Sequence, residues 1–151
     1  MKLRTNFVIE STLKNYIMSR NVEIAQSYFN AVAKGDFETV GSLLSDDVVW
    51  HQPGKGTQSG TYSGKPDLFA HLGNFMKWSN GTFAIDNIEY ITGNGQLVAA
   101  SINFKAEKGD KSMSMKGIDL LRIEGGVIKE VWLFSENIDT EDEFWTSAAE
   151  S

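Results

Sequence analysis

The stretch KGIDLLRIEGGVIKEVWLF, residues 116–134, is typical of two strands joined by a tight turn at Gly125-Gly126. Because side chains alternate along a strand, one face of the first strand carries Asp119 with apolar neighbours: Met115, Leu121 and Ile123. The other face mixes charged and apolar side chains: Lys116, Ile118, Leu120, Arg122 and Glu124. A carboxylate among apolar neighbours is costly without a partner. Asp119 is therefore a candidate functional acid, or else a buried acid paired with a Tyr, Trp or Lys across the sheet.

Other strand-like segments precede this hairpin in the chain. The pattern predicts four strands in all, at residues 83–91, 97–106, 112–124 and 127–135. Sequences that favour hairpin turns separate them: GNG at 93–95, KGDK at 108–111 and GG at 125–126. The C-terminal half is therefore predicted to form consecutive antiparallel hairpins.

The N-terminal half has helical spacing instead. A first helix over 22–33 is predicted by the apolar positions Val22, Ala25, Phe29 and Val32, with Asn21 as its N-cap. Asp36 can cap a second helix over 37–44, and Pro66 suits the first turn of a third. The third helix has the apolar stripe Leu68, Phe69, Leu72, Phe75 and Met76. An extended run at 48–51 and a glycine-rich loop at 54–64 lie between the second and third helices.

Helices followed by a run of strands indicate the α+β class, with a curved antiparallel sheet and three N-terminal helices on its concave face. We expect the compact domain to span 21–146. Residues 1–20 would form an N-terminal extension, either helical or poorly ordered, and 147–151 a tail. Because the outer face of the sheet carries residues such as Ile118 and Leu120, a second subunit is the natural cover, and a homodimer is expected.

Composition limits the classes of function. The chain has 151 residues, of which 41% are hydrophobic and 23% charged, as expected for a globular domain. A net charge of -6 argues against a nucleic-acid partner, and no stretch approaches the length of a membrane span. Cysteine is absent, which fits a reducing compartment and a cytoplasmic location. The two histidines show no metal-binding spacing, so neither a metal nor a cofactor is expected.

Two segments carry a resemblance to a known family. YFNAVAKGDFETVGSLLSDDVVWHQPG, residues 28–54, and GIDLLRIEGGVIKEVWLFSE, residues 117–136, resemble the opening and the closing hairpin of the SnoaL-like and ketosteroid-isomerase-like proteins, in the nuclear transport factor two-like superfamily. The resemblance covers roughly residues 21–145. It implies a cone-shaped, cystatin-like α+β barrel with a deep apolar pocket, commonly dimeric.

The resemblance also implies roles for three residues. Tyr28 lies seven residues before the Gly of Gly-Asp, and Asp119 lies on the penultimate strand, where ketosteroid isomerases have their oxyanion-hole pair. Gln52 stands where those enzymes have the general-base Asp, and an amide cannot abstract a proton. Asp119 could stay neutral and donate a hydrogen bond beside Tyr28, as the oxyanion-hole Asp of ketosteroid isomerases does, or act ionised as a general acid/base, as in SnoaL-like cyclases.

Several aromatic and imidazole side chains are candidate substrate contacts. His51 and Gln52 would position substrate, although His51 faces away if Gln52 faces the pocket, unless Pro53 ends the alternation. We place Trp50 on the side of His51. Trp132 and Phe75 are predicted to line the pocket. His71 is interpreted as an exposed or partly buried helix residue, and the acidic segment 139–145 as a solvated end whose aromatic residues can pack on the sheet or on a partner.

The sequence thus favours a protein that binds an apolar, aromatic or polyketide-like small molecule. As an enzyme, it would be a cofactor-independent isomerase, cyclase or dehydratase acting next to a carbonyl, with Asp119 as acid or proton shuttle and Tyr28 polarising the oxygen. The alternative is a non-catalytic ligand-binding or dimerising interaction module on the same fold.

Overall fold

The computed structural model of the chain describes the backbone of residues 2–151 and the side chains from residue 8 onward. In chain order the elements are α1 (Lys2–Lys34), α2 (Phe37–Leu43), β1 (Leu44–Gln52), β2 (Gly60–Ser63), α3 (Lys65–Trp78), β3 (Ala84–Asn94), β4 (Leu97–Lys108), β5 (Lys111–Glu124), β6 (Val127–Ser135) and α4 (Ile138–Glu150). The fold is α+β, as the order of sequence patterns predicted. No helix in this part of the chain is both long and apolar enough to cross a membrane.

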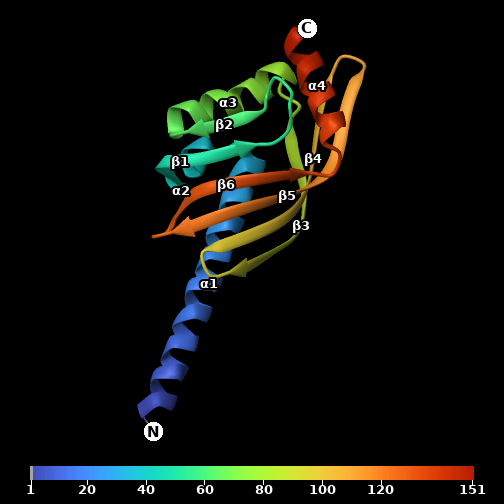
Figure 1. Cartoon of the computed structure of the whole chain (residues 1–151). Coiled ribbons are helices and arrows are strands. Elements are labelled where there is room, and N and C mark those ends of the chain that lie inside the picture. The colour runs from blue at the N-terminus through green and yellow to red at the C-terminus, as the bar shows by residue number, and fades with distance from the viewer. Residues whose placement is uncertain (1) are drawn as a thin grey trace.

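The strands form one curved, unclosed sheet in the order β2-β1-β6-β5-β4-β3 (Figure 1). The three predicted hairpins pair β3 with β4, β4 with β5, and β5 with β6, all antiparallel. However, β1 pairs with β6 in parallel, so the prediction of a purely antiparallel sheet is wrong for this pair. The chain leaves β1, passes through β2, α3 and the hairpins, and returns beside β1 in the same direction.

Helices cover the concave side of the sheet. α1 packs mainly on β3 and β4, whereas α3 packs on β1 and β2. Gly93 of β3 lies against α1, and a Cβ atom there would come within 3.0 Å of both the Met18 and Val22 side chains. The core between these layers contains Phe29 on α1, Leu68 on α3 and Leu121 on β5, all nearly inaccessible to solvent.

The first helix is longer than predicted. α1 is continuous from Lys2 to Lys34, so Asn21 is not an N-cap. Instead the Asn21 side chain is buried, and its Nδ2 donates a hydrogen bond to the Gly95 carbonyl in the β3–β4 turn, at 3.0 Å. Figure 1 shows the N-terminal part of α1 extending beyond the sheet, where Val8 and Tyr16 are exposed.

Two further elements differ from the sequence predictions. The glycine-rich segment 54–64 contains the short strand β2, which pairs with β1. The acidic C-terminal segment forms α4, whose N-cap Asn137 accepts a hydrogen bond from the Thr140 backbone N–H. Phe144 and Trp145 of α4 are buried, so this segment is not a solvated end. Its aromatic residues were expected to pack on the sheet or on a partner. α4 lies against β5 and β6, and Trp145 also packs against Phe75 of α3, with ring centroids 4.5 Å apart.

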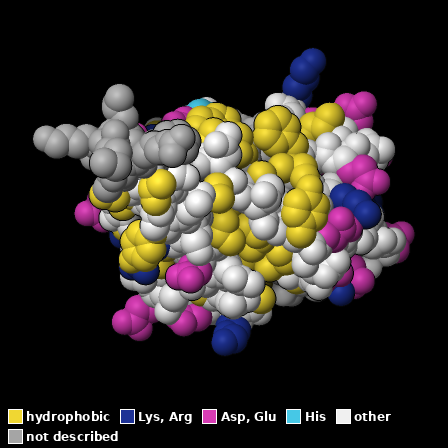
Figure 2. All heavy atoms as spheres, turned by 90° about the horizontal axis from the view of Figure 1, so that it is seen from below, with side chains coloured by type: hydrophobic (Ala, Val, Ile, Leu, Met, Phe, Trp, Pro, Cys, Tyr) yellow, Lys and Arg dark blue, Asp and Glu magenta, His cyan; other side chains and the backbone are white. Residues whose placement is uncertain are grey.

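The face of the sheet turned away from the helices exposes apolar side chains on neighbouring strands. Tyr90, Ile118 and Phe134 are 63%, 39% and 57% exposed. Ile118 pairs with Phe134 across β5 and β6, and Ser101 of β4 connects Ile118 to Tyr90. We refer to Tyr90, Ile118 and Phe134 as the outer apolar row. Figure 2 views the molecule from below and shows hydrophobic side chains gathered in the middle of that view, with charged ones mainly around them.

Candidate functional site

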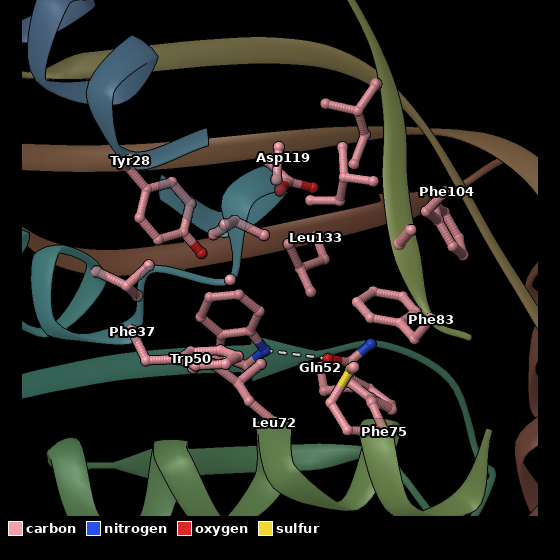
Figure 3. Close-up of a pocket in the computed structure, with 18 of the residues that line it drawn as sticks. Tyr28, Phe37, Trp50, Gln52, Leu72, Phe75, Phe83, Phe104, Asp119 and Leu133 are labelled. Atoms are coloured by element: carbon pink, nitrogen blue, oxygen red, sulfur yellow. Dashed lines mark hydrogen bonds between the residues drawn. The ribbon is translucent and has the colours of Figure 1, made fainter. Parts of the chain in front are cut away.

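A cavity of about 340 Å³ lies between the concave face of the sheet and the helices. Most of its wall is apolar: Val32, Phe37, Val40, Trp50, Leu72, Phe75, Met76, Phe83, Ile85, Ile102, Phe104 and Leu133. The polar residues of the lining are few and come from several elements: Tyr28, Lys34, Gln52, Asp119, Ser135 and Glu141. Tyr28, Gln52 and Asp119 are labelled in Figure 3. A mostly apolar hollow with a few placed polar groups is the usual form of a small-molecule site.

Asp119 faces this cavity from the middle of β5. Its cross-strand partners are Ala100 on β4 and Leu133 on β6, which surround the carboxyl group with apolar side chains. Only 6% of the residue is exposed, so the predicted burial among apolar neighbours is confirmed. No hydrogen bond to its carboxyl group is formed by the residues from 8 onward. The side chains from residue 8 onward therefore give no support to the alternative in which Asp119 is paired with a Tyr, Trp or Lys.

Tyr28 enters the cavity from α1. Its ring is 3% exposed and packs edge-on against Phe29, with centroids 5.1 Å apart. Figure 3 shows its hydroxyl pointing into the space between Trp50 and Asp119, and no side chain in the described part of the protein accepts a hydrogen bond from it. Tyr28 and Asp119 thus bring two unpartnered polar groups to one apolar cavity.

Burial changes the titration of both groups. Burial, together with the nearby charge of Glu141, raises the pKa of the Asp119 carboxyl from 3.8 to about 7. Burial and the charge of Asp119 raise the pKa of the Tyr28 hydroxyl far above its ordinary value, so Tyr28 remains a hydrogen-bond donor at neutral pH. Asp119 can therefore gain or lose a proton near pH 7, whereas Tyr28 keeps its own.

Glu141 is a second buried acid, brought to the cavity wall by α4. It is 4% exposed and accepts a hydrogen bond from the Ser135 hydroxyl at 2.8 Å. Burial raises the pKa of Glu141, and the Ser135 hydrogen bond partly opposes that rise. Sequence reasoning missed Ser135 and Glu141. A signal was available for Glu141, because it shares the spacing of one buried helical face with Phe144, Trp145 and Ala148.

Gln52 is held by two neighbours. Its Oε1 atom accepts hydrogen bonds from the Trp50 indole nitrogen and from His71 Nε2, each at 3.0 Å. Trp50 therefore lies on the side of Gln52 and not on that of His51, because residues two apart in a strand share a face. Both Trp50 and Gln52 line the cavity, as does the predicted Phe75.

His71 was expected to be exposed or partly buried, and it is instead fully buried, with 2% of the residue exposed. The Tyr62 ring stacks on it with centroids 3.8 Å apart, and Phe75 contacts its edge. Burial lowers the pKa of His71 to about 4, so the ring is neutral at pH 7. Its helical spacing from Leu68 and Phe75, three and four residues away, was the available sequence signal for burial.

His51 and Trp132 lie outside this cavity. Their rings stack with centroids 5.5 Å apart, in a separate, shallow depression on the other side of the strands. His51 Nε2 is 2.6 Å from Glu130 Oε2, and its Nδ1 is 3.4 Å from the Thr61 hydroxyl. The expectation that His51 and Trp132 contact a ligand beside Asp119 is therefore corrected, since strand alternation points them away from it.

The curved sheet, its covering helices and the cavity between them define a protein of cystatin-like α+β fold. The chain belongs to the SnoaL-like family: the model of the SnoaL-like domain matches residues 25–131. The family resemblance of the two segments around Tyr28 and Asp119 is thereby confirmed.

Known proteins share this architecture over most of their length. A Xanthomonas campestris protein of unknown function with cystatin-like fold is 43% identical, with a TM-score of 0.80 over 83% of this chain and 97% of that one. Bal32a, from a soil-derived mobile gene cassette, is 22% identical, with a TM-score of 0.81 over 85% and 98%. The uncharacterized protein Rv0034 of Mycobacterium tuberculosis (strain H37Rv) is 22% identical over 125 residues, 83% of this chain and 95% of that protein.

Proposed function

We propose that this SnoaL-like protein binds an apolar small molecule and performs cofactor-independent acid–base chemistry next to a carbonyl group, as an isomerase, cyclase or dehydratase. One observation carries the proposal: the Asp119 carboxyl, with a pKa of about 7 and no hydrogen-bond partner among the described side chains, faces the same apolar cavity as the Tyr28 hydroxyl. A general acid/base works best when its pKa lies near the operating pH.

Each residue has a distinct part in this chemistry. Ionised Asp119 removes a proton from the carbon next to the substrate carbonyl and returns it to another atom of the substrate. The Tyr28 hydroxyl donates a hydrogen bond to the carbonyl oxygen, which stabilises the negative charge of the enolate. The apolar wall excludes water and strengthens that interaction. Gln52 contacts the substrate but takes no proton, because its amide has no basic atom.

Proteins of this fold differ in what they do. TerC, co-crystallised with polyporic acid, is 15% identical, with a TM-score of 0.72 over 87% of this chain and 99% of that one. An LEH-like epoxide hydrolase of M. tuberculosis is 14% identical, with a TM-score of 0.62 over 87% and 92%. At such identities the likeness shows the fold alone, so the reaction assigned here rests on the groups in this cavity.

The second candidate is a non-catalytic ligand carrier, which Gln52 favours because it replaces the base expected from the resemblance. One experiment separates the two candidates. Exchange of the protons next to the carbonyl of tetralone is followed by NMR in D₂O, with the wild type and with Asp119→Asn. Catalysed exchange that falls at least ~100-fold in the variant supports acid–base chemistry by Asp119. Binding of tetralone without catalysed exchange in either protein supports a carrier.

We also propose that two copies associate through the outer apolar row, because Ile118 and Phe134 are adjacent, exposed and on paired strands. A second copy of the same chain would cover this row by a two-fold arrangement. Asp119 faces the cavity on the other side of the sheet, whereas Phe134 belongs both to this row and to the residues that line the cavity. A cytoplasmic location remains a prediction from the lack of cysteine.

A further inference from the structure

The orientation of the Gln52 amide follows from the chemistry of its neighbour. An indole N–H can only donate a hydrogen bond, so the Gln52 atom that lies 3.0 Å from Trp50 Nε1 must be the carbonyl oxygen. The same oxygen lies 3.0 Å from His71 Nε2, so that nitrogen must also carry a hydrogen. Neutral His71 is thereby fixed as the Nε2–H tautomer, and its Nδ1 is buried without a partner.

The amide nitrogen of Gln52 is left on the cavity side. Figure 3 shows it pointing away from Trp50, toward Phe83. The side chains described from residue 8 onward give it no hydrogen-bond acceptor, and Gln52 is only 7% exposed. An N–H₂ group that faces an apolar cavity without an acceptor from the protein is unfavourable. An acceptor atom on a bound molecule would satisfy it.

Strand register relates this donor to the acid–base pair. His51 of β1 pairs with Trp132 of β6, and the next residues in register are Gln52 and Leu133. Leu133 in turn pairs with Asp119 of β5. Gln52 and Asp119 therefore flank Leu133 on one face of the sheet, about 10 Å apart at the backbone, since neighbouring strands are spaced by ~4.8 Å.

From this arrangement we infer that the cavity selects a flat apolar ligand with two acceptor oxygens on different sides of its carbon skeleton, such as a quinone or a diketone. One oxygen lies at Tyr28 and Asp119, and the other accepts from the Gln52 amide. Leu133 contacts the carbon skeleton between them. The inference deepens the proposed function and rests on it only for the use of this cavity as the ligand site.

Trp50 and His71 act as positioning residues in this scheme. They hold the amide oxygen, so Gln52 cannot rotate to offer that oxygen to the ligand without leaving two buried N–H groups unpaired. A ligand with one oxygen leaves the Gln52 N–H₂ group unsatisfied, and sites built on such groups discriminate strongly against it. The cavity thus favours two-oxygen ligands over one-oxygen ligands of equal size.

Calorimetric titration with naphthoquinone and tetralone tests the inference: the two probes share a bicyclic carbon skeleton and differ in the second oxygen and in the saturation of one ring, and the Gln52→Glu variant isolates the effect of the oxygen. In the wild type we expect naphthoquinone to bind at least ~10-fold more tightly. Gln52→Glu keeps one oxygen for Trp50 and His71. At about pH 8 its second oxygen is an acceptor in the place of the amide N–H₂ donor, so the preference for naphthoquinone over tetralone should disappear. The matched change Gln96→Glu, in the exposed β3–β4 turn, should leave it intact.

Side-chain amide NMR of the wild type provides a measurement that needs no variant in the cavity. Naphthoquinone should shift the Gln52 N–H₂ resonances, and tetralone should shift them much less. Equal binding of both probes, a preference that survives Gln52→Glu, unmoved Gln52 resonances, or no binding of either probe would overturn the inference. These outcomes are independent of the proposed acid–base role, which fails instead if Asp119→Asn leaves catalysed proton exchange of tetralone unchanged.

Discussion

Asp119 and Tyr28 reach the same cavity from two layers of the fold, one from the centre of the sheet and the other from α1, and the charge of the carboxylate contributes to the raised pKa of the phenol. The carboxyl group titrates near neutral pH while the phenol does not. This pairing supplies a proton carrier and a permanent hydrogen-bond donor without any metal or cofactor in the scheme.

The stability of the protein should depend on pH through Asp119. In the unfolded chain an Asp titrates near 4, whereas the buried carboxyl has a pKa of about 7. Between these values the folded state holds a proton that the unfolded state has released, so the free energy of unfolding falls as pH rises from about 4 to about 7. The loss is at most about 4 kcal/mol.

Asp119→Asn removes this dependence. Urea unfolding at about pH 5 and about pH 8 should show the variant gaining stability relative to the wild type at the higher pH. Asp110→Asn, in the exposed β4–β5 turn, serves as the control and should give no such gain. If wild type and Asp119→Asn respond alike to pH, the carboxyl is not held in a low-dielectric site.

Tyr28→Phe should slow catalysis more than it weakens binding. The hydroxyl stabilises charge that develops only as the enolate forms, so its loss is expected to cost ~100-fold in the rate of proton exchange. The ring itself stays packed against Phe29, so affinity for tetralone should change far less. Tyr90→Phe, on the outer face, is the matched control. Equal effects of the two substitutions would remove Tyr28 from the mechanism.

Local patterns made much of the fold predictable. Alternation along residues 112–124, together with the Gly125-Gly126 turn, was enough to place Asp119 on the buried face, and the other hairpins followed in the same way. The parallel β1–β6 pairing could not be derived, because no local rule relates two strands that are separated by four other strands and a helix. The acidic composition of residues 139–145 favoured the prediction of a solvated end in place of the packed helix α4, although Glu141 and Trp145 show the spacing of a buried face.

The site was predictable only in part, for similar reasons. Asp119 was found by alternation, and Tyr28 and Gln52 by their places in the family pattern. The bond between His71 and Gln52 joins a helix to a strand and depends on tertiary packing. His51 and Trp132 show the opposite error: their chemistry suggested a site, but alternation turns both to the other side of the sheet.

His71 should remain neutral well below the usual titration range of histidine. Its pKa is lowered to about 4 by burial, and its Nε2 donates to Gln52. Ring ¹⁵N shifts should therefore show a protonated Nε2 and an unprotonated Nδ1 at about pH 6. The chain has two histidines, so His51→Gln leaves one imidazole and assigns the signals. A protonated Nδ1 would contradict the derived orientation of the Gln52 amide.

The outer apolar row should control self-association. Phe134→Lys places a charge at the β6 end of the row, beside Ile118, and is expected to shift the protein from dimer to monomer in sedimentation velocity. Val8→Lys adds the same charge to the exposed part of α1 and should leave the dimer intact. A wild-type monomer, or a dimer broken by Val8→Lys and not by Phe134→Lys, would exclude this interface.

Glu141 should influence the pH dependence of the proposed proton exchange. The rate of proton exchange is expected to rise with pH through the pKa of Asp119, about 7, and then level off as the carboxylate becomes fully ionised. Since the charge of Glu141 helps to raise that pKa, Glu141→Gln should move the midpoint to lower pH. The substituted amide retains an oxygen for the Ser135 hydroxyl, so packing of α4 against β6 is preserved.

Glu143→Gln, on the same helix, is the control for this prediction, because it changes the net charge by the same amount. An identical shift in both variants would assign the effect to overall charge, whereas a midpoint that moves only in Glu141→Gln assigns it to the charge interaction between the two buried acids.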